Sequence, residues 1–203
     1  MFDDLRAQII SHFHDRHLVL PGRPLNGPPR HTEGIWHWIE HNHRQNRALW
    51  DEEDQARRTD VDDGAIAANK RRIDRYNQSR NDAIEHMDEA VLKRLQDTSL
   101  DENAWLNSET AGSIIDRLSI ISLKIHHMGL QAQRNDVDQT HRDHALEKQQ
   151  RLKIQRADLQ YCLDTLLSQA AQGRAYFKVY RQFKMYNDPR MNPYLSGMKA
   201  PLT

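Results

Sequence analysis

The sequence contains few cysteine residues and few hydrophobic residues. Cys162 is the single cysteine among 203 residues, which excludes an internal disulfide and a metal site built from several cysteines. Hydrophobic residues make up 37% of the chain, mean hydropathy is -0.90, and no run approaches the roughly 20 apolar residues that span a bilayer. The N-terminus lacks the basic and apolar regions of a signal peptide, so we expect a cytoplasmic protein without a transmembrane segment.

An excess of charge of one sign is absent as well. The 29 basic and 29 acidic side chains cancel, so the chain has no overall field that would attract nucleic acid or an anionic membrane. Charged residues make up 29% of the sequence, which suits long amphipathic helices with wide solvated faces. We therefore expect a single helical domain over residues 1–203 that binds no nucleic acid.

Apolar side chains recur at helical spacing in five segments. We expect helices over about 2–17, 32–58, 62–96, 110–135 and 138–172. Thr32 is placed to cap the second helix, and Gly173 is placed to end the fifth. The expected fold is all-α, an antiparallel bundle of about four long helices with a short N-terminal helix. Cys162 falls on the apolar stripe of the fifth helix, where we expect a small buried residue.

Two segments lie outside these helices. Residues 18–32 contain four prolines and two glycines and are expected to form a loop, either a connector or a lid. Residues 174–203 begin with basic side chains on one side and aromatic side chains on another, which predicts an amphipathic C-terminal helix followed by an extended tail. The basic edge of this helix is a candidate phosphate clamp or docking surface.

Polar residues interrupt the apolar stripes of the three middle helices. In the third helix, Asn77 and Arg80 fall between Ile73 and Ile84 on the inward stripe. The full set of inward or flanking polar residues is His43, Asn46, Glu53, Asp54, Asp74, Asn77, Arg80, Asn81, Glu85, Asp88, Asp116, Arg117 and Lys124. An unpaired buried polar group costs roughly 1–3 kcal/mol. These groups therefore either pair in a network that fixes helix register or line a solvated cleft that accepts a polar ligand.

The sequence also contains four ordered blocks, HRQNRALWDEEDQAR, KRRIDRYNQSRNDAIEHMDE, GSIIDRLSIISLKIHHM and FKMYNDPRMNPYL. Together they resemble a bacterial family of unknown function whose members are often encoded beside glycosyltransferases in surface-polysaccharide gene clusters. The resemblance implies sugar chemistry without an established reaction. It also implies that the family positions are His43, Asn46, Trp50, Glu53, Asp54, Asp74, Asn77, Arg80, Asn81, Glu85, Asp116, Arg117, Lys124, Lys184, Tyr186, Asn187, Asp188 and Pro189.

Two patterns bear on metal binding. HWIEH, residues 37–41, matches the H-x-x-E-H spacing of inverted zincins, but the chain has 12 histidines and no identifiable distal ligand. Glu53, Asp54, Asp74 and Glu85 are candidate Mg²⁺ ligands, as in helical nucleotide pyrophosphatases. Only EHMD, residues 85–88, matches the carboxylate pairs of those enzymes. A divalent metal is therefore a candidate cofactor, but the sequence assigns no set of ligands to it.

The leading hypothesis is a polar central cleft that binds, or acts on, a phosphorylated sugar or nucleotide sugar. Its catalytic candidates, chosen as groups able to transfer a proton, are His43, Glu53, Asp74 and Glu85. Its substrate-binding candidates are Asn46, Trp50, Asn77, Arg80, Asn81, Asp116, Arg117, Lys124, Lys184, Tyr186 and Asn187. One alternative is a non-catalytic partner of a glycosyltransferase with a purely structural buried network. The other is an Mg-dependent enzyme similar to nucleotide pyrophosphohydrolases. All three hypotheses are compatible with a homo-oligomer.

Overall fold

The computed structural model describes residues 1–19, 27–181 and 188–196. The elements in these residues are the 3-10 helix η1 (Asp3–Leu5), the helices α1 (Ala7–Val19), α2 (Gly34–Gln55), α3 (Asp63–Leu95), α4 (Ala111–Ala132), α5 (Gln139–Ala171) and α6 (Pro193–Ser196), and the strands β1 (Trp105–Asn107) and β2 (Ala175–Phe177). Helices dominate, and the predicted all-α class is confirmed. The five predicted segments correspond to α1 through α5.

The helices α3, α4 and α5 each begin at a residue whose side chain caps the helix, whereas α2 has no side-chain cap. The caps are Asp62, Thr110 and Asp138, which accept hydrogen bonds from the backbone N–H groups of Ala65, Ser113 and His141 over 2.8, 3.1 and 2.7 Å. Each cap satisfies an N–H group that the first helical turn leaves unpaired. The predicted Thr32 cap is wrong, because the N-cap of α2 is Glu33, which makes no side-chain cap bond. Gly34 has a φ of 69°, so the chain turns into the helix only there.

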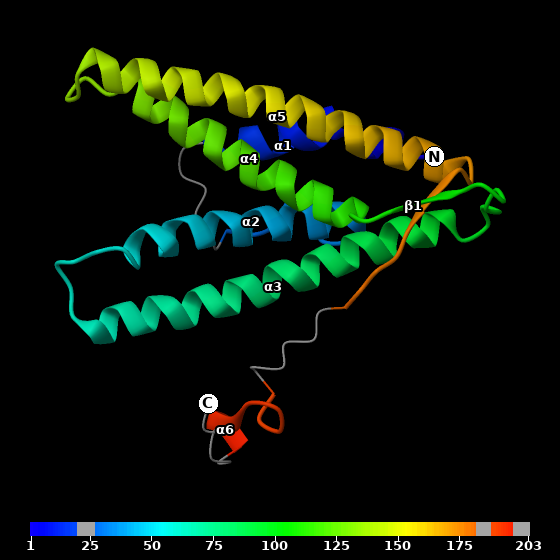
Figure 1. Ribbon diagram of the computed structural model, residues 1–203, viewed down its shortest axis with the longest axis horizontal. Helices are drawn as coiled ribbons and strands as arrows, with labels where there is room; N and C mark the ends of the chain where they lie inside the picture. Colours follow the sequence, from blue (N-terminus) through cyan, green and yellow to red (C-terminus); the bar gives the residue numbers. More distant parts are fainter. Residues whose placement is uncertain (20–26, 182–187, 197–203) are drawn as a thin grey trace.

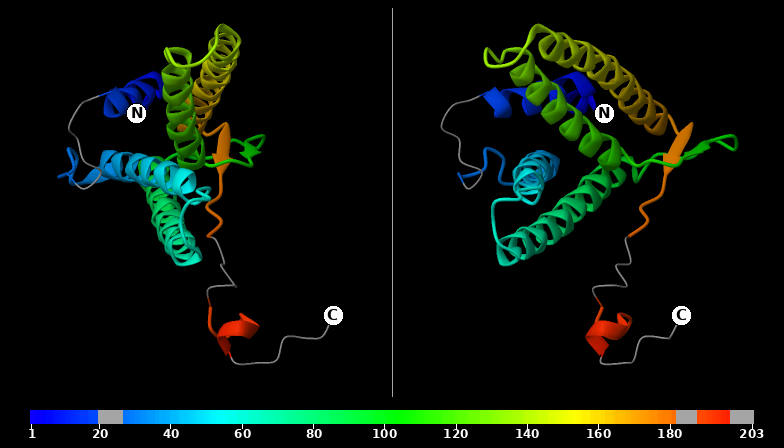
Figure 2. Two further views of the ribbon diagram at one scale, coloured as in Figure 1. Left: turned by 90° about the vertical axis from the view of Figure 1, so that its left-hand side faces the viewer. Right: turned by 60° about the vertical axis from the view of Figure 1, so that its left-hand side comes forward.

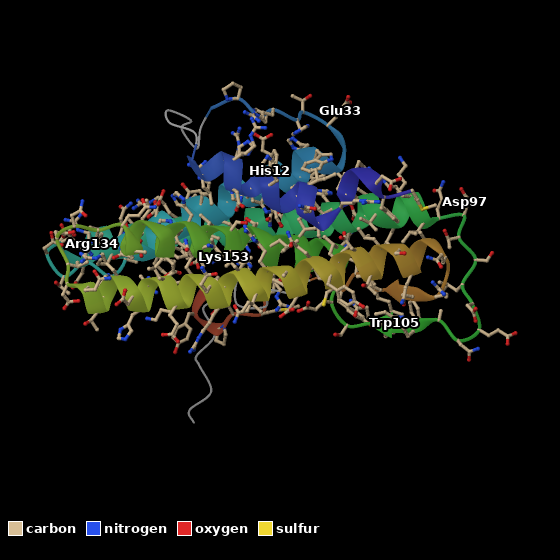
Figure 3. All side chains as sticks on the ribbon, turned by 90° about the horizontal axis from the view of Figure 1, so that it is seen from above. His12, Glu33, Asp97, Trp105, Arg134 and Lys153 are labelled. Carbon is tan, nitrogen blue, oxygen red and sulfur yellow. The ribbon has the colours of Figure 1, made fainter. Side chains whose placement is uncertain are left out.

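The long helices form two antiparallel hairpins, α2 with α3 and α4 with α5 (Figure 1). Helix α1 lies behind them and packs on α4 and α5. The hairpins converge where α3 leads into α4 and diverge toward their other ends (Figure 2). Asp97 and Arg134 mark opposite ends of the molecule, and His12 lies on the outer side of α1 (Figure 3). On the side where the two hairpins diverge, solvent can reach polar side chains of α2, α3 and α4.

The apolar core draws on η1 and on each of α1 through α5. Its fully buried large side chains include Leu5, Ile10, Ile39, Met87, Ile114, Ile115, Leu118, Leu163 and Leu166. Burying one such side chain contributes roughly 1.5–3 kcal/mol. Gly112 allows α3 and α4 to approach closely, because an added Cβ would lie 2.6 Å from the backbone oxygen of Ile84. The angle between the two hairpins therefore depends on a glycine at the start of α4.

Buried Glu40 fastens the end of the predicted Pro/Gly-rich loop to α2. Its carboxylate accepts hydrogen bonds from the backbone N–H groups of Arg30 and His31, at 2.8 and 3.1 Å, and from Arg44 at 2.7 Å. Arg44 also donates to the carbonyl of Pro28 over 3.0 Å. Residues 27–31 are thus held by charge-assisted hydrogen bonds, while residues 20–26 of this loop lie outside the described part of the chain.

The segment after α5 is a strand where an amphipathic helix was predicted. Gly173 ends α5 at a φ of 71°, and an added Cβ there would meet the Ser99 carbonyl oxygen at 2.1 Å. The chain then forms β2, which pairs in parallel with β1 and places Trp105 opposite Ala175. Residues 178–181 are not helical either. The helix prediction is wrong over residues 174–181, because pairing with β1 and burial of Phe177 outweigh the helical pattern of the segment.

Candidate functional site

Asp116 is the centre of a buried polar network that joins three helices. Its carboxylate accepts hydrogen bonds from Asn42 at 2.8 Å and from Asn46 at 2.9 Å, both on α2. Arg80 of α3 donates to the same carboxylate through Nε, at 2.8 Å, and through Nη2, at 2.5 Å. This bidentate contact raises the pKa of Arg80, so the guanidinium stays charged. The network fixes the register of α2 and α3 against α4.

A histidine pair lies beside this network. His14 of α1 stacks on His43 of α2, with ring centroids 4.6 Å apart and ring planes at 20°. His43 Nδ1 is 2.8 Å from the Ser119 hydroxyl, whereas His43 Nε2 and both ring nitrogens of His14 have no hydrogen-bond partner in the part of the chain that the structure describes. Burial lowers the pKa of His14 to about 3 and that of His43 well below its usual value. The neighbouring His14 carbonyl opposes the lowering of the His43 pKa, although it does not reach hydrogen-bond geometry. Because both pKa values are lowered from 6.5, both rings are neutral at pH 7.

Next to the network, a cavity of about 330 Å³ opens between α2, α3 and α4. We call it the α2–α3–α4 cavity. Its polar lining consists of Asn46, Trp50, Glu53, Asp54, Arg57, Asn77 and Arg80. Its apolar lining consists of Leu49, Ile120 and Leu123. A few convergent polar groups beside an apolar surface are typical of small-molecule sites.

The polar groups of this cavity differ in how far they are already paired. Glu53 forms a surface ion pair with Arg57 at 3.0 Å, and Arg80 is held by Asp116. The Asn77 side chain makes no hydrogen bond with the described residues. The Trp50 ring is stacked on His127 at 4.3 Å, and its Nε1 is buried and has no hydrogen-bond partner among the described residues. The cavity therefore contains one amide, that of Asn77, whose side-chain hydrogen bonds remain to be made.

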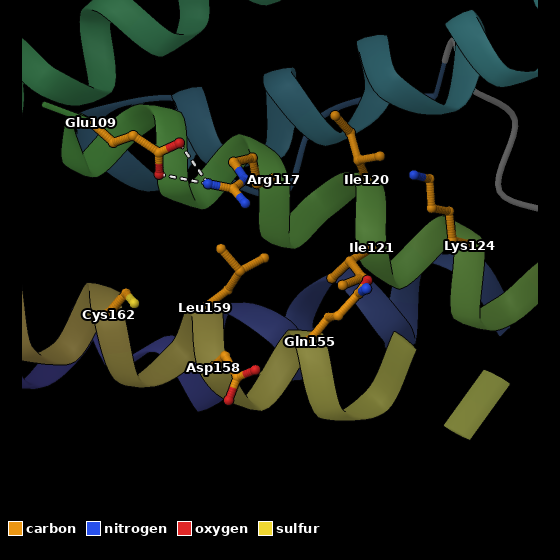
Figure 4. A pocket seen from close by; sticks show the side chains of 9 residues that line it. All are labelled: Glu109, Arg117, Ile120, Ile121, Lys124, Gln155, Asp158, Leu159 and Cys162. Carbon is orange, nitrogen blue, oxygen red and sulfur yellow. Dashed lines mark hydrogen bonds and ion pairs between the residues drawn. The ribbon is translucent and has the colours of Figure 1, made fainter. Parts of the chain in front are cut away.

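A second hollow, of about 610 Å³, lies between α4 and α5, and we call it the α4–α5 groove. Arg117 reaches over it but is paired with Glu109, at 2.5 and 2.7 Å (Figure 4). Ile120 and Lys124 point away from α5 in the same view. Ile120 lines both hollows, so it separates the groove from the α2–α3–α4 cavity. Cys162 is exposed along the groove, so the prediction of a buried cysteine is wrong.

The remaining predicted site residues lie elsewhere. Asp74 is exposed and forms a 2.6 Å ion pair with Lys70. Asn81 and Glu85 line a smaller hollow of about 100 Å³ that also contains Asp88. The tail candidates Lys184, Tyr186 and Asn187 lie outside the described residues. The structure thus brings Asn46, Trp50, Glu53, Asp54, Asn77 and Arg80 together around one cavity, and Asp116 is hydrogen-bonded to two of them, Asn46 and Arg80. Asp74, Asn81, Glu85, Arg117 and Lys124 do not line this cavity.

No group of three or more His, Cys, Asp or Glu side chains is arranged to hold a metal ion in residues 1–19, 27–181 and 188–196. The HWIEH side chains have separate partners: His37 contacts the His31 carbonyl at 3.0 Å, and His41 contacts the Ser79 hydroxyl at 2.7 Å. Glu40 holds the loop described above. Among the Mg²⁺ candidates, Glu53 and Asp54 share a cavity that contains neither Asp74 nor Glu85.

Sequence reasoning missed several members of the buried network, namely His14, Asn42 and Ser119. Spacing carried a partial signal, because Asn42 and Asn46 lie one helical turn apart, as do Asp116 and Ser119. Asp88 was noted only as a flanking residue, yet it accepts a hydrogen bond from Gly112 N–H at 2.6 Å. Burial raises the pKa of Asp88 to about 6. This carboxylate therefore caps the start of α4 from the neighbouring helix.

Comparison with known proteins adds one finding about ancestry. A family model described as "Protein of unknown function (DUF4254)" matches residues 36–179, more than two thirds of the chain. No curated protein and no solved structure matches significantly. In the part of the chain that the structure describes, every helix is too short or too polar to cross a membrane.

Proposed function

The chain belongs to the DUF4254 family of proteins of unknown function, and we propose that it binds a phosphorylated sugar in the α2–α3–α4 cavity. The observation that carries the proposal is the convergence of Asn46, Asn77 and Arg80 with Glu53 and Trp50 around one apolar surface. Amides, a carboxylate and a guanidinium supply the donors and acceptors that sugar hydroxyls require. The apolar lining offers a surface for the C–H groups of a sugar ring.

The size of the cavity favours the sugar portion of the ligand as its occupant. A volume of about 330 Å³ lies at the small end of the range for ligand pockets, roughly 300–1,000 Å³. A complete nucleotide sugar would have to extend beyond the cavity, across Ile120 and into the α4–α5 groove. A sugar phosphate fits with less rearrangement, and it is therefore the ligand that we propose.

Lys124 is the proposed partner of the phosphate group. It lies one turn after Ile120 on α4, points away from α5, and has no ion-pair partner among the described residues. The cations Arg57, Arg80 and Arg117 each already pair with a carboxylate. A phosphate at the rim near Ile120 would therefore meet one ammonium group whose charge is not already neutralised.

Sugar chemistry, as opposed to binding of another polar ligand, is supported by the gene neighbourhood that the family resemblance implies. If the bound sugar is transformed, Glu53 is the candidate acid or base, because it is half-exposed and lines the cavity. His43 is less suitable, since its ring is buried between His14 and Ser119 and does not line the cavity. Asp74 and Glu85 face other surroundings.

A second candidate function is that of a non-catalytic partner of a glycosyltransferase. It is favoured by the dense pairing around Asp116, where Asn42, Asn46 and Arg80 are all satisfied within the chain. Such a network stabilises a scaffold without needing a ligand. The two functions differ at Asn77, which contributes nothing to this network.

The test is a thermal-shift screen of the wild-type protein with hexose phosphates, nucleotide sugars and MgCl₂, followed by calorimetric titration of each stabilising compound. Asn77→Ala is expected to weaken binding about tenfold or more, which corresponds to about 1.4 kcal/mol, because one hydrogen-bonding side chain is lost. The matched control is Gln78→Ala, an exposed neighbour on α3 that does not line the cavity. Absence of stabilisation by every compound, or equal affinity of Asn77→Ala and wild type, would favour the scaffold.

A further inference from the structure

The outer face of α5 carries large hydrophobic side chains that no described residue covers. The exposed fractions of Leu146, Ile154 and Tyr161 are 45%, 64% and 73%. Helix α5 packs on α4, α1 and β2 with its other face, and it forms one outer edge of the molecule (Figures 1 and 3). In the monomer, the apolar side chains of this region therefore lie on a surface that is exposed to water.

The exposed residues follow the spacing of a helix–helix seam. Ile154, Ala157 and Tyr161 are separated by three and then four residues, so they lie along one side of the helix. Ala157 is small and exposed, and it lies between the two large side chains. A small residue at this position allows a second helix to approach closely, with the large residues on either side of the contact.

Charge is distributed unevenly along the same helix. Residues 148–156 contain four basic side chains and no acidic one, whereas residues 158–171 contain two acidic side chains and no basic one. Lys153 and Asp164 lie eleven residues apart, about three turns, and so on the same flank of the exposed seam. Lys153 has no partner among the described residues, and one oxygen of Asp164 accepts from the Ala7 N–H at 2.8 Å. The flank therefore has a positive end and a negative end.

We propose that two copies of this chain form a dimer through antiparallel packing of their α5 helices. A two-fold axis near Ala157 places Ile154 of each copy against Tyr161 of the other. The same register places Lys153 of each copy near Asp164 of the other, because a two-fold axis perpendicular to both helices brings equivalent flanks together. Each contact is made twice, and the exposed hydrophobic side chains become buried.

The charge pattern selects the antiparallel arrangement over the parallel one. In a parallel pair the two-fold axis runs along the helices and places equivalent flanks on opposite sides of the seam, so Lys153 and Asp164 of the two copies would not meet. In the antiparallel pair both contacts are attractive. The surface is thus complementary to itself, and a second copy of the chain is the occupant that its chemistry fits.

The first experiment measures the mass of the full-length protein by sedimentation equilibrium. Wild type is expected to be a dimer, and Lys153→Glu or Asp164→Lys alone to raise the dimer dissociation constant at least about tenfold. An equimolar mixture of the two variants is expected to return to within about threefold of the wild-type value, because each copy then offers the charge that the other lacks. A monomeric wild type, or a mixture as weak as the separate variants, would overturn the proposal. Misfolding of either variant could not produce the rescue.

The second experiment does not depend on charge. Ala157→Cys, made in a Cys162→Ser background, is expected to form an interchain disulfide under mild oxidation, since the two copies of residue 157 lie near the axis. The matched control is Lys148→Cys in the same background, which lies on a different side of α5. Equal cross-linking of the two variants would contradict the arrangement, whatever the result of the sedimentation experiment.

Discussion

His14 of α1 and His43 of α2 stack in the core with their ring centroids 4.6 Å apart and their planes at 20°. Both rings are buried and uncharged, and three of their four nitrogens lack a hydrogen-bond partner within residues 1–19, 27–181 and 188–196. The stack joins α1 to α2, while Ser119 joins His43 to α4. This contact makes the stability of the fold depend on pH.

We predict that the free energy of unfolding falls by about 2–3 kcal/mol between pH 7 and pH 5. The folded-state pKa of His14 is about 3 and that of His43 is well below the usual 6.5, so only the unfolded chain takes up protons on these rings in that range. Asp88 acts in the opposite direction, because its folded-state pKa of about 6 lies above its usual 3.8 and its contribution is lost as pH rises through 6. The lowered pKa values of His41, His126 and His127 add to the loss at low pH. Urea denaturation at several pH values measures the sum.

We predict that His14→Leu stabilises the protein at pH 7, by about 1 kcal/mol or more, because it removes two buried ring nitrogens that lack partners. The same variant should lose less stability than wild type when the pH is lowered to 5. His12→Leu, on the exposed side of α1, is the matched control for the same substitution outside the core. Destabilisation by His14→Leu at pH 7 would mean that the histidine stack contributes more than its unpaired nitrogens cost.

We predict that Asp116→Ala destabilises the fold by about 3–5 kcal/mol, because it leaves the Arg80 guanidinium without its buried counter-charge. Asn42 and Asn46 would lose the same acceptor. Urea denaturation gives the difference. Arg117→Met, on the same helix, removes only a surface ion pair with Glu109 and should cost less than about 1 kcal/mol. Similar losses for the two variants would show that the Asp116 network contributes little.

We predict that Gly112→Ala destabilises the protein by roughly 1–3 kcal/mol, because the new methyl group cannot avoid contact with backbone. Its Cβ would lie 2.6 Å from the Ile84 carbonyl oxygen and 2.9 Å from Asp88 Oδ1. In Gly64→Ala the close contact is with the Asp62 side chain alone, which can move but also caps α3. The higher helix propensity of alanine offsets a weakened cap, so this variant should change stability by less than Gly112→Ala does. Thermal denaturation of both variants tests whether α3 and α4 are as close as described.

The boundaries of α3, α4 and α5 were predictable because they depend on residues within one turn. Asp62, Thr110 and Asp138 cap the helix that follows each of them, and Gly173 ends α5. The strand β2 was not predictable in this way. It exists because Ala175 pairs with Trp105, seventy residues earlier in the chain, and the local pattern of the segment is helical.

The candidate site was predictable in part for a similar reason. Asn46 and Glu53 on α2, and Asn77 and Arg80 on α3, share the faces that two neighbouring helices turn toward each other, so they meet at one cavity. Asp74, only three residues before Asn77, lies on the exposed side of α3 with Lys70. Further along this 33-residue helix, Glu85 faces a different hollow, because the hairpins diverge along their length.

The sequence by itself determined that the chain is helical and where α3, α4 and α5 begin and end, since these depend on spacing and caps within single helices. Only the tertiary structure decided which inward groups meet. The angle between the two hairpins brings Arg80 to Asp116, stacks His14 on His43, and places Ile120 between the cavity and the groove. These contacts join residues from different helices, and spacing within one helix carries no information about how two helices cross.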